Sequence, residues 1–204
     1  MKLFYSPASP YVRKVLVLAH EAAIADKIEL LDSHANPVNR DSRIVARNPT
    51  GKVPTMVLDD DSTIYDSHVI CEYVDTQHGS TPFFPKQAPM RWQALTLHAL
   101  ADGLLDAALL ARYEQVLRPE KLQWSDWLNG QLDKMRSSVA TLESTWLPHL
   151  QSTMDIGVIA CGCALGYLDF RFPDLDWRTA HPGVSQWYQD FANRPSMQAT
   201  WPRG

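Results

Sequence analysis

The chain opens with "KLFYSPASPYVRKV", residues 2–15, in which a short apolar run leads through a turn into a helical pattern. The run KLFY is typical of a β-strand. Serine is favoured at a helix N-cap and proline in the first helical turn, so we expect a helix to begin at Ser9 and Pro10. Val12, Val15, Leu16 and Ala19 then fall on one face of that helix. A strand, a turn and a helix in this order predict the start of an α/β domain.

The remaining residues up to 78 continue the alternation of strand and helix. IELLD predicts a second strand, and a weaker helix is expected over roughly 39–46. TMVLDDDSTIYDS has the apolar run, acidic turn and second apolar run of a hairpin. SHVICEYVDTQHG predicts a third helix, with Ser67 as its N-cap and Gly79 as its end. The order β-α-β-α-β-β-α predicts one helix between parallel strands, followed by an antiparallel hairpin.

The second half of the sequence is helical. GSTPFFPKQAP carries three prolines in eleven residues and predicts a linker. Helical patterns follow at about 90–117, 123–147, 153–168 and 182–193. We therefore expect an α/β domain over residues 1–78, a linker over 79–89 and an all-helical domain over 90–204.

Composition limits the classes of function. The chain has 204 residues, a net charge of −4 and 45% apolar residues, without a basic stripe for nucleic acid or an acidic membrane. Its longest apolar stretch, Ile156 to Leu168, is 13 residues, which is too short to span a bilayer. The odd number of cysteines, Cys71, Cys161 and Cys163, has no disulfide-framework spacing. These features predict a cytoplasmic protein.

The first loop lacks the sulfur atoms of a redox site. Its centre, Ser9-Pro-Tyr-Val12, stands where a redox protein of the thioredoxin type would show Cys-Pro-Tyr-Cys. Disulfide exchange by a protein thiol is therefore disfavoured. Ser9 is either a helix cap alone or a hydroxyl aimed at a ligand over the helix N-terminus, where exposed N–H groups favour an anion.

Two further segments each have a structural and a functional interpretation. Val53-Pro54 is either an ordinary strand entry or a cis turn that exposes the N–H and C=O of Val53 to an extended peptide. Asp66 and Ser67 either cap the third helix only, or hold a carboxylate and an amine of a ligand. In this order within one β-α-β-α-β-β-α unit, the three segments predict a pocket for a small peptide with a thiol, an amino group and carboxylates.

These motifs resemble the glutathione S-transferase superfamily over nearly the full length of the chain. SPASPYVRKV looks like the active-site loop of the serine-type bacterial cytosolic members (similar to the theta, zeta and beta classes), NPTGKVPTMVL like the cis-proline segment and YDS like the γ-glutamyl clamp. STMD, residues 152–155, looks like the N-capping box of the core helix, and HPGVSQWYQDFANRPSMQ like the C-terminal helix. The resemblance implies a thioredoxin-like βαβαββα domain, a C-terminal helical bundle and a cytoplasmic homodimer.

The resemblance also implies residue roles. Val53 pairs with the cysteinyl backbone of glutathione through the cis-Pro54 turn, and Asp66 and Ser67 hold the γ-glutamyl amine and carboxylate. The glycine carboxylate lies near two basic side chains, Lys52 and His34.

The sulfur-contacting hydroxyl is expected from Ser9. Ser6, three residues earlier, is the first alternative, and Tyr5 on the strand is the second. The loop without its own sulfur would then activate a thiol that the ligand brings.

The helical domain offers one polar cluster. His98, Asp102 and Asp106 share one helix face, but no second cluster completes a metal site, so we expect no metal. Either aspartate could face a cleft or reach across a dimer interface, as an acidic residue on this helix does in several relatives. The alternative is a charge paired with Arg112 or Arg13.

Two classes of function follow. The first is a detoxifying glutathione transferase, in which the thiolate of glutathione as co-substrate attacks a small electrophile. Glutathione-dependent isomerisation or dehalogenation is an alternative within this class, because neither reaction requires a different active-site loop. The second is a non-catalytic member that binds glutathione or a protein. We expect glutathione and an electrophile as partners, and neither nucleic acid nor membrane.

Overall fold

The computed structural model describes residues 1–204 as two compact units. One unit comprises Met1–Phe84 together with Pro195–Gly204, and the other comprises Pro85–Arg194. These limits differ from the expected ones at two places, the linker and the C-terminal segment.

The boundary between the two units falls within the predicted linker, because the first part of the linker is hydrogen-bonded to the third helix. The carboxylate of Asp75, a buried residue at the end of that helix, accepts hydrogen bonds from the N–H groups of Phe83 (2.7 Å) and Phe84 (3.0 Å). The C-terminal segment joins the first unit because it packs on the first helix, where Arg13 donates to the carbonyl of Met197. Neither contact has a local sequence signature.

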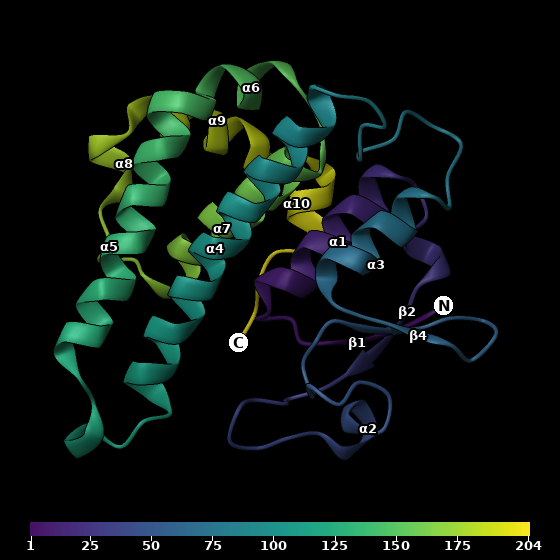
Figure 1. The fold of residues 1–204 in the computed structure, drawn as a ribbon, viewed down its shortest axis with the longest axis horizontal. Coiled ribbons are helices and arrows are strands. Elements are labelled where there is room, and N and C mark those ends of the chain that lie inside the picture. Colours follow the sequence, from purple (N-terminus) through teal and green to yellow (C-terminus); the bar gives the residue numbers. More distant parts are fainter. The chain divides into compact units, whose positions relative to one another are not determined.

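The first unit contains a four-stranded sheet with the order β2-β1-β3-β4. β1 and β2 are parallel, whereas β3 is antiparallel to both β1 and β4. The predicted order β-α-β-α-β-β-α is confirmed (Figure 1). The elements are β1 (Lys2–Tyr5), α1 (Pro10–Glu21), the 3-10 helix η1 (Ala25–Lys27), β2 (Glu29–Asp32), α2 (Ser42–Val45), β3 (Thr55–Val57), β4 (Thr63–Ile64), α3 (Ser67–Asp75) and α10 (Pro195–Ala199).

Both limits of α3 differ from the prediction. α3 ends at Asp75 instead of Gly79, and its N-cap is Asp66, whose side chain accepts from the N–H of His68. The prediction of Ser67 as the N-cap was therefore wrong, because the preceding aspartate, which is an equally good cap, has the extended backbone that this position needs. Ser67 is the first helical residue.

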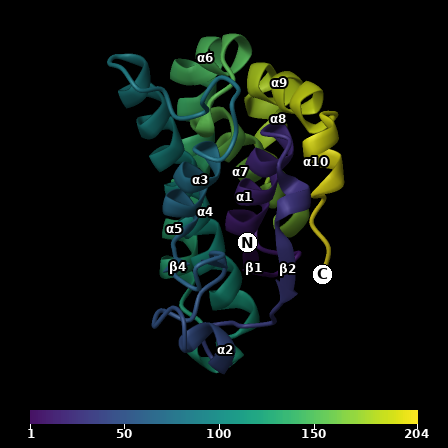
Figure 2. The ribbon, with the colours of Figure 1, turned by 90° about the vertical axis from the view of Figure 1, so that its right-hand side faces the viewer.

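Helix α1 builds the core of the first unit. Val12, Val15, Leu18 and Ala19 recur at helical spacing and are all buried. α1 packs beside α3, and the two helices are seen together in Figure 2. This packing fixes the N-terminal end of α1, and with it Ser9, at the end of β1.

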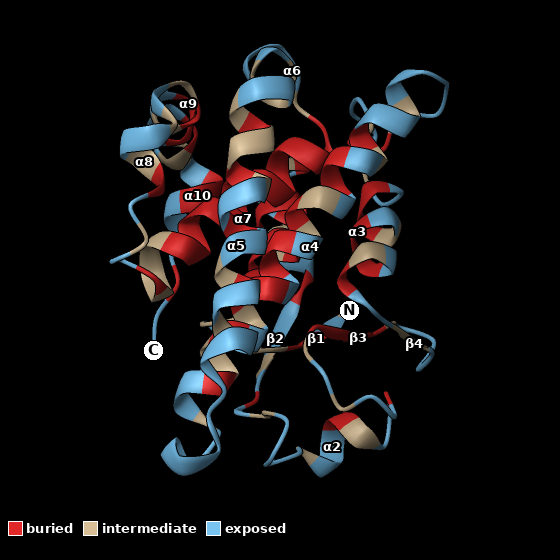
Figure 3. Cartoon of the chain, turned by 60° about the vertical axis from the view of Figure 1, so that its left-hand side comes forward, coloured by how far each residue is buried: buried red, intermediate tan, exposed pale blue.

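The second unit is helical and is built around α7. Its elements are α4 (Met90–Val116), the 3-10 helix η2 (Glu120–Leu122), α5 (Ser125–Thr141), the π-helical turn η3 (Leu142–Trp146), α6 (Leu147–Ser152), α7 (Ile156–Arg171), α8 (Trp177–Ala180) and α9 (Pro182–Ala192). α7 is buried over nearly its whole length, as Figure 3 shows. Gly157 allows α7 to approach α4, since a β-carbon there would lie 2.7 Å from the carbonyl oxygen of Ala94.

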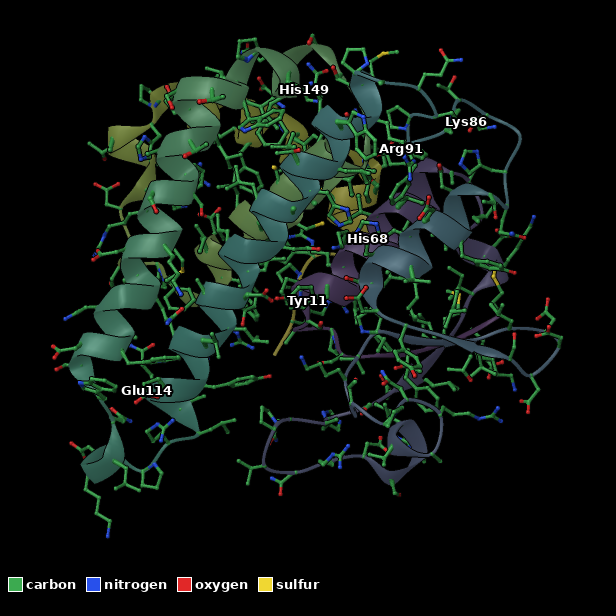
Figure 4. The ribbon with its side chains drawn as sticks, viewed as in Figure 1. Tyr11, His68, Lys86, Arg91, Glu114 and His149 are labelled. Atoms are coloured by element: carbon green, nitrogen blue, oxygen red, sulfur yellow. The ribbon has the colours of Figure 1, made fainter.

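The cap of α7 also differs from the expected motif. Ser152 closes α6, and Asp155 is the N-cap that accepts from the N–H of Val158 (3.1 Å). The second oxygen of Asp155 contacts Nε2 of His149, a residue of α6, at 2.8 Å (Figure 4). The buried helix therefore begins with both carboxylate oxygens of its cap occupied.

One helix, α4, has the length and apolar composition to cross a membrane. Half of its most apolar window is buried, and it packs against α5 and α7 within the second unit. Core helices of globular units pass the same test.

Candidate functional site

The register of the sheet brings the predicted loop residues to one end of the first unit. β1 ends at Tyr5, which pairs with Asp32 at the end of parallel β2. Antiparallel β3 begins at Thr55, opposite Phe4, and β4 ends at Ile64, opposite the second residue of β3. The segments that follow β1, β2 and β4 and the segment that precedes β3 therefore meet at the same end of the sheet. They carry Ser6, Ser9, His34, Lys52, Val53, Pro54, Asp66 and Ser67.

Ser9 caps the helix that starts there. Its Oγ accepts from the N–H of Val12 at 3.3 Å, and its own N–H donates to the carbonyl of Ser6 at 3.0 Å. A hydroxyl has one hydrogen to donate, and no acceptor for it is found in the protein. Ser9 thus offers a free O–H at the positive end of a 12-residue helix.

The two alternatives to Ser9 have different surroundings. Ser6 is partly buried and lies before the turn, so it does not share the helix N-terminus. The Tyr5 phenol is hydrogen-bonded to Asp32, which raises the pKa of Tyr5, and burial and the charge of Asp32 raise it further. Because this phenol already donates to a carboxylate, it is a poorer donor to a ligand sulfur than Ser9.

The Val53-Pro54 peptide bond is cis. The N–H and C=O of Val53 have no hydrogen-bond partner within the protein, while its side chain packs against Phe4, Ile44 and Val57. The N–H and C=O of Val53 are therefore unpaired two residues before the start of β3. This is the geometry that the peptide-pairing interpretation requires.

A buried polar network holds this loop. Asn48, 1% exposed, donates from Nδ2 to Thr55 Oγ1 at 2.8 Å, and its Oδ1 accepts from both the N–H and the hydroxyl of Thr50. Thr55 in turn donates to the carbonyl of Lys52 at 2.8 Å. Sequence reasoning missed Asn48 and Thr55. Their only signal is that two polar residues flank the loop at positions that the fold buries.

The N-terminus of α3 is the third part of the site. Asp66 is exposed, and its Oδ1 accepts from the N–H of His68 at 2.9 Å, which leaves its other oxygen available. Ser67 is 3% exposed, yet its hydroxyl has no partner in the protein. An acidic cap beside a free hydroxyl can hold an ammonium group and a carboxylate together.

Two basic side chains border these segments. Lys52 precedes Val53 and is exposed, and His34 lies two residues beyond β2 and is also exposed. Neither side chain forms an ion pair. Both are thus available to an anionic group at this end of the sheet.

The acidic residues of the helical domain lie on α4, in the second unit. Asp102 Oδ2 lies 3.2 Å from Nε2 of His98, one helical turn earlier, and Asp106 is exposed. Across the chain, no group of three or more His, Cys, Asp or Glu side chains is arranged to hold a metal ion. The described contacts therefore give Asp102 a histidine partner on its own helix.

Comparisons with known proteins identify the family of the chain. The family model described as "Glutathione S-transferase, N-terminal domain" matches residues 8–77, and "Glutathione S-transferase, C-terminal domain" matches residues 125–190. The chain is 32% identical to the uncharacterized GST-like protein YibF of Escherichia coli K12, over 99% of this chain and 98% of that protein.

Solved structures give the same result. A glutathione transferase family member from Pseudomonas fluorescens Pf-5 with bound glutathione is 48% identical, with a TM-score of 0.98 over 100% of this chain and 99% of that one. A structure of a family member from the same organism, with bound S-(propanoic acid)-glutathione, is 47% identical, with a TM-score of 0.93 over the whole of both chains. The fold is thus a thioredoxin-like domain joined to a helical domain, and the chain belongs to the glutathione S-transferase superfamily.

Proposed function

We propose that this protein is a glutathione transferase that binds glutathione at the end of the sheet in its first unit. The observation that carries the proposal is the free O–H of Ser9 at the N-terminus of α1, in a loop without cysteine. A hydroxyl and a helix N-terminus both favour an anion, and the anion that suits them is a thiolate carried by the ligand.

The other segments fit the rest of glutathione. The unpaired main chain of Val53 suits the cysteinyl backbone of the tripeptide. Asp66 and Ser67 suit the γ-glutamyl amine and carboxylate, and Lys52 and His34 suit the glycine carboxylate. The relatives from Pseudomonas fluorescens were obtained with glutathione and with an S-substituted glutathione bound, which supports a ligand of this class.

The energies are sufficient for thiol activation. A free thiol has a pKa near 8.5, so a thiolate at neutral pH needs a depression of about two units, or roughly 2.7 kcal/mol. A hydrogen bond to a charged group supplies about 1.5–3 kcal/mol and a helix N-terminus about 0.3–1 kcal/mol. No side-chain base is required, because the thiol proton passes to solvent.

The chemical step is a displacement or an addition. The thiolate sulfur forms a bond to an electrophilic carbon, and the leaving group departs with the electron pair of the broken bond. In an addition the pair moves onto the substrate and is protonated from water. We expect the protein to act as a cytoplasmic homodimer in detoxification, with Asp102 or Asp106 near the electrophile or the neighbouring subunit.

The test is calorimetric titration with glutathione and with an S-alkyl glutathione, followed by turnover of an aryl halide, an epoxide and an α,β-unsaturated acid. Micromolar to low millimolar binding of both ligands with turnover of an electrophile is the expected result. Binding without turnover of any class would favour the non-catalytic member. No binding of either ligand would refute the glutathione site.

A further inference from the structure

The C-terminal segment Pro195–Gly204 is a strap that belongs to the first unit. α10, the helical part of the strap, packs on α1 (Figure 1). The hydroxyl of Ser196 donates to the carboxylate of Glu21, and Nη2 of Arg13 donates to the carbonyl of Met197 at 3.1 Å. The strap is thus attached to both halves of α1.

Arg13 is the central anchor of the strap. It is 4% exposed, and its guanidinium lies 5.4 Å from the centroid of the Trp201 ring, a cation–π arrangement. The N–H of Arg13 also donates to the carbonyl of Ser9 at 3.0 Å. The first turn of α1 therefore carries both Ser9 at its N-cap and Arg13, the residue that binds the strap.

Beyond Trp201 the strap reaches the loop itself. The N–H of Arg203 donates to the carbonyl of Pro7 at 3.3 Å, and Pro7 lies between Ser6 and Ser9. The Arg203 side chain is exposed and forms no ion pair. Its charge acts on the neighbouring strand end, where it lowers the pKa of Tyr5 against the larger opposing effects of Asp32 and burial.

We infer that Arg203, held by this strap, is a further electrostatic residue of the thiol site and stabilises the thiolate of bound glutathione together with Ser9. The inference rests on the proposed function. It gives the C-terminal segment a role in the chemistry of a loop that is far away in the sequence. The other ionisable groups around this end of the sheet are Tyr5, Arg13, Asp32, His34, Lys52 and Asp66, together with the Asp41–Arg43 pair that contacts the end of β2.

The substitution Arg203→Gln separates charge from structure, because the main-chain N–H that binds Pro7 is kept. Arg203→Lys retains the charge. Lys27→Gln is the matched control: it removes one exposed positive charge from η1, beyond the opposite end of α1. The pKa of the bound thiol is measured from its ultraviolet thiolate absorbance as a function of pH, in complexes saturated with glutathione.

We expect Arg203→Gln to raise the thiol pKa by about 0.3–0.5 unit at low ionic strength, and by much less in molar salt, since one exposed charge acts through water. Arg203→Lys and Lys27→Gln should retain the wild-type value. Trp201→Ala, at a residue that is 47% exposed, should raise the pKa in the same direction by loosening the strap.

Equal pKa values for Arg203→Gln and Lys27→Gln would overturn the inference, and so would a wild-type value for Trp201→Ala. A salt-independent shift would also overturn it, because it would indicate a structural change. If the wild-type protein bound no glutathione, the proposed function would fail first and the inference with it. Failure of the inference alone would leave wild-type binding intact.

Discussion

Replacing Thr55 by valine tests whether the buried network positions the main chain of Val53. Valine has nearly the shape of threonine, but it lacks the hydroxyl that donates to the Lys52 carbonyl and accepts from Asn48, two hydrogen bonds of 2.8 Å each. Thr55 is fully buried, so water cannot replace these bonds without rearrangement. What remains for the Asn48 amide is a 3.4 Å contact with the Lys52 carbonyl.

The expected cost follows from these contacts. Each hydrogen bond contributes about 1 kcal/mol net, and a poorly satisfied amide at Asn48 adds to the loss, giving about 2–3 kcal/mol. A loss of 2 kcal/mol lowers Tm by about 4–8 °C in a protein of this size. In the variant, glutathione binding has to order the loop around Val53, and fixing the backbone of one residue costs about 1–2 kcal/mol. Because this cost is subtracted from the binding free energy, the Kd for glutathione should rise about tenfold.

The measurements are urea unfolding and calorimetric titration with glutathione. Thr55→Ser is the control, since it keeps the hydroxyl and removes only a methyl group, and it should bind glutathione with nearly wild-type affinity. If Thr55→Val is destabilised but binds glutathione as tightly as the wild type, the network stabilises the fold without positioning Val53. That result would refute the reasoning.

Three further substitutions address other parts of the structure. Ser9→Ala should raise the pKa of the bound thiol by about 1–2 units through loss of a charge-assisted donor, and an unaltered thiolate absorbance would favour Ser6 or Tyr5 as the donor. Ser67→Ala should weaken glutathione binding in calorimetry by about 1 kcal/mol, and unchanged affinity would contradict the clamp assignment. Glu114 accepts from the N–H of Trp124 (2.8 Å), which lowers the pKa of its carboxyl. Its stabilising contribution is therefore present above its ordinary pKa near 4.5 and is lost as the pH falls below that value. Glu114→Gln should be less stable than wild type near neutral pH, and urea titrations should show the difference shrinking in acid; a pH-independent difference would exclude the charge as its cause.

The order of elements could be predicted because it depends on local patterns. Apolar residues alternate or recur within each segment, and prolines and glycines separate the segments. Once the order is known, the parallel β1–β2 pair and the antiparallel hairpin bring the loops to one sheet end. The location of the candidate site therefore follows from topology, before any side-chain contact is known.

Helix limits were harder to predict, since neighbouring residues compete for the same role. Asp66 and Ser67 are both good N-caps, and the backbone of Asp66 decides between them. At α7, Asp155 is the cap although a serine stands three residues earlier. A sequence pattern shows which residues are able to cap a helix, whereas the backbone conformation at the start of the helix decides which of them is the cap.

Long-range contacts could not be predicted by any periodic pattern. The hydrogen bond from Arg13 to Met197 joins residues 184 positions apart. Because Phe83 and Phe84 are hydrogen-bonded to Asp75, the first unit ends at residue 84 and not at the expected residue 78. The strap adds residues 195–204 to the same unit. These contacts involve main-chain groups, which every residue carries, so the sequence does not mark them.

The distribution of sulfur in the chain argues for chemistry on a ligand thiol. Cys71, Cys161 and Cys163 are all buried, and burial raises the pKa of Cys161 well above its ordinary value. A thiol in such surroundings stays protonated and cannot be reached by a substrate. The loop at Ser9, in contrast, combines an accessible helix N-terminus with a hydroxyl free to donate. The groups proposed to stabilise a thiolate and the protein's own thiols are thus separated in the structure, which favours the proposal that the reactive sulfur arrives on a ligand.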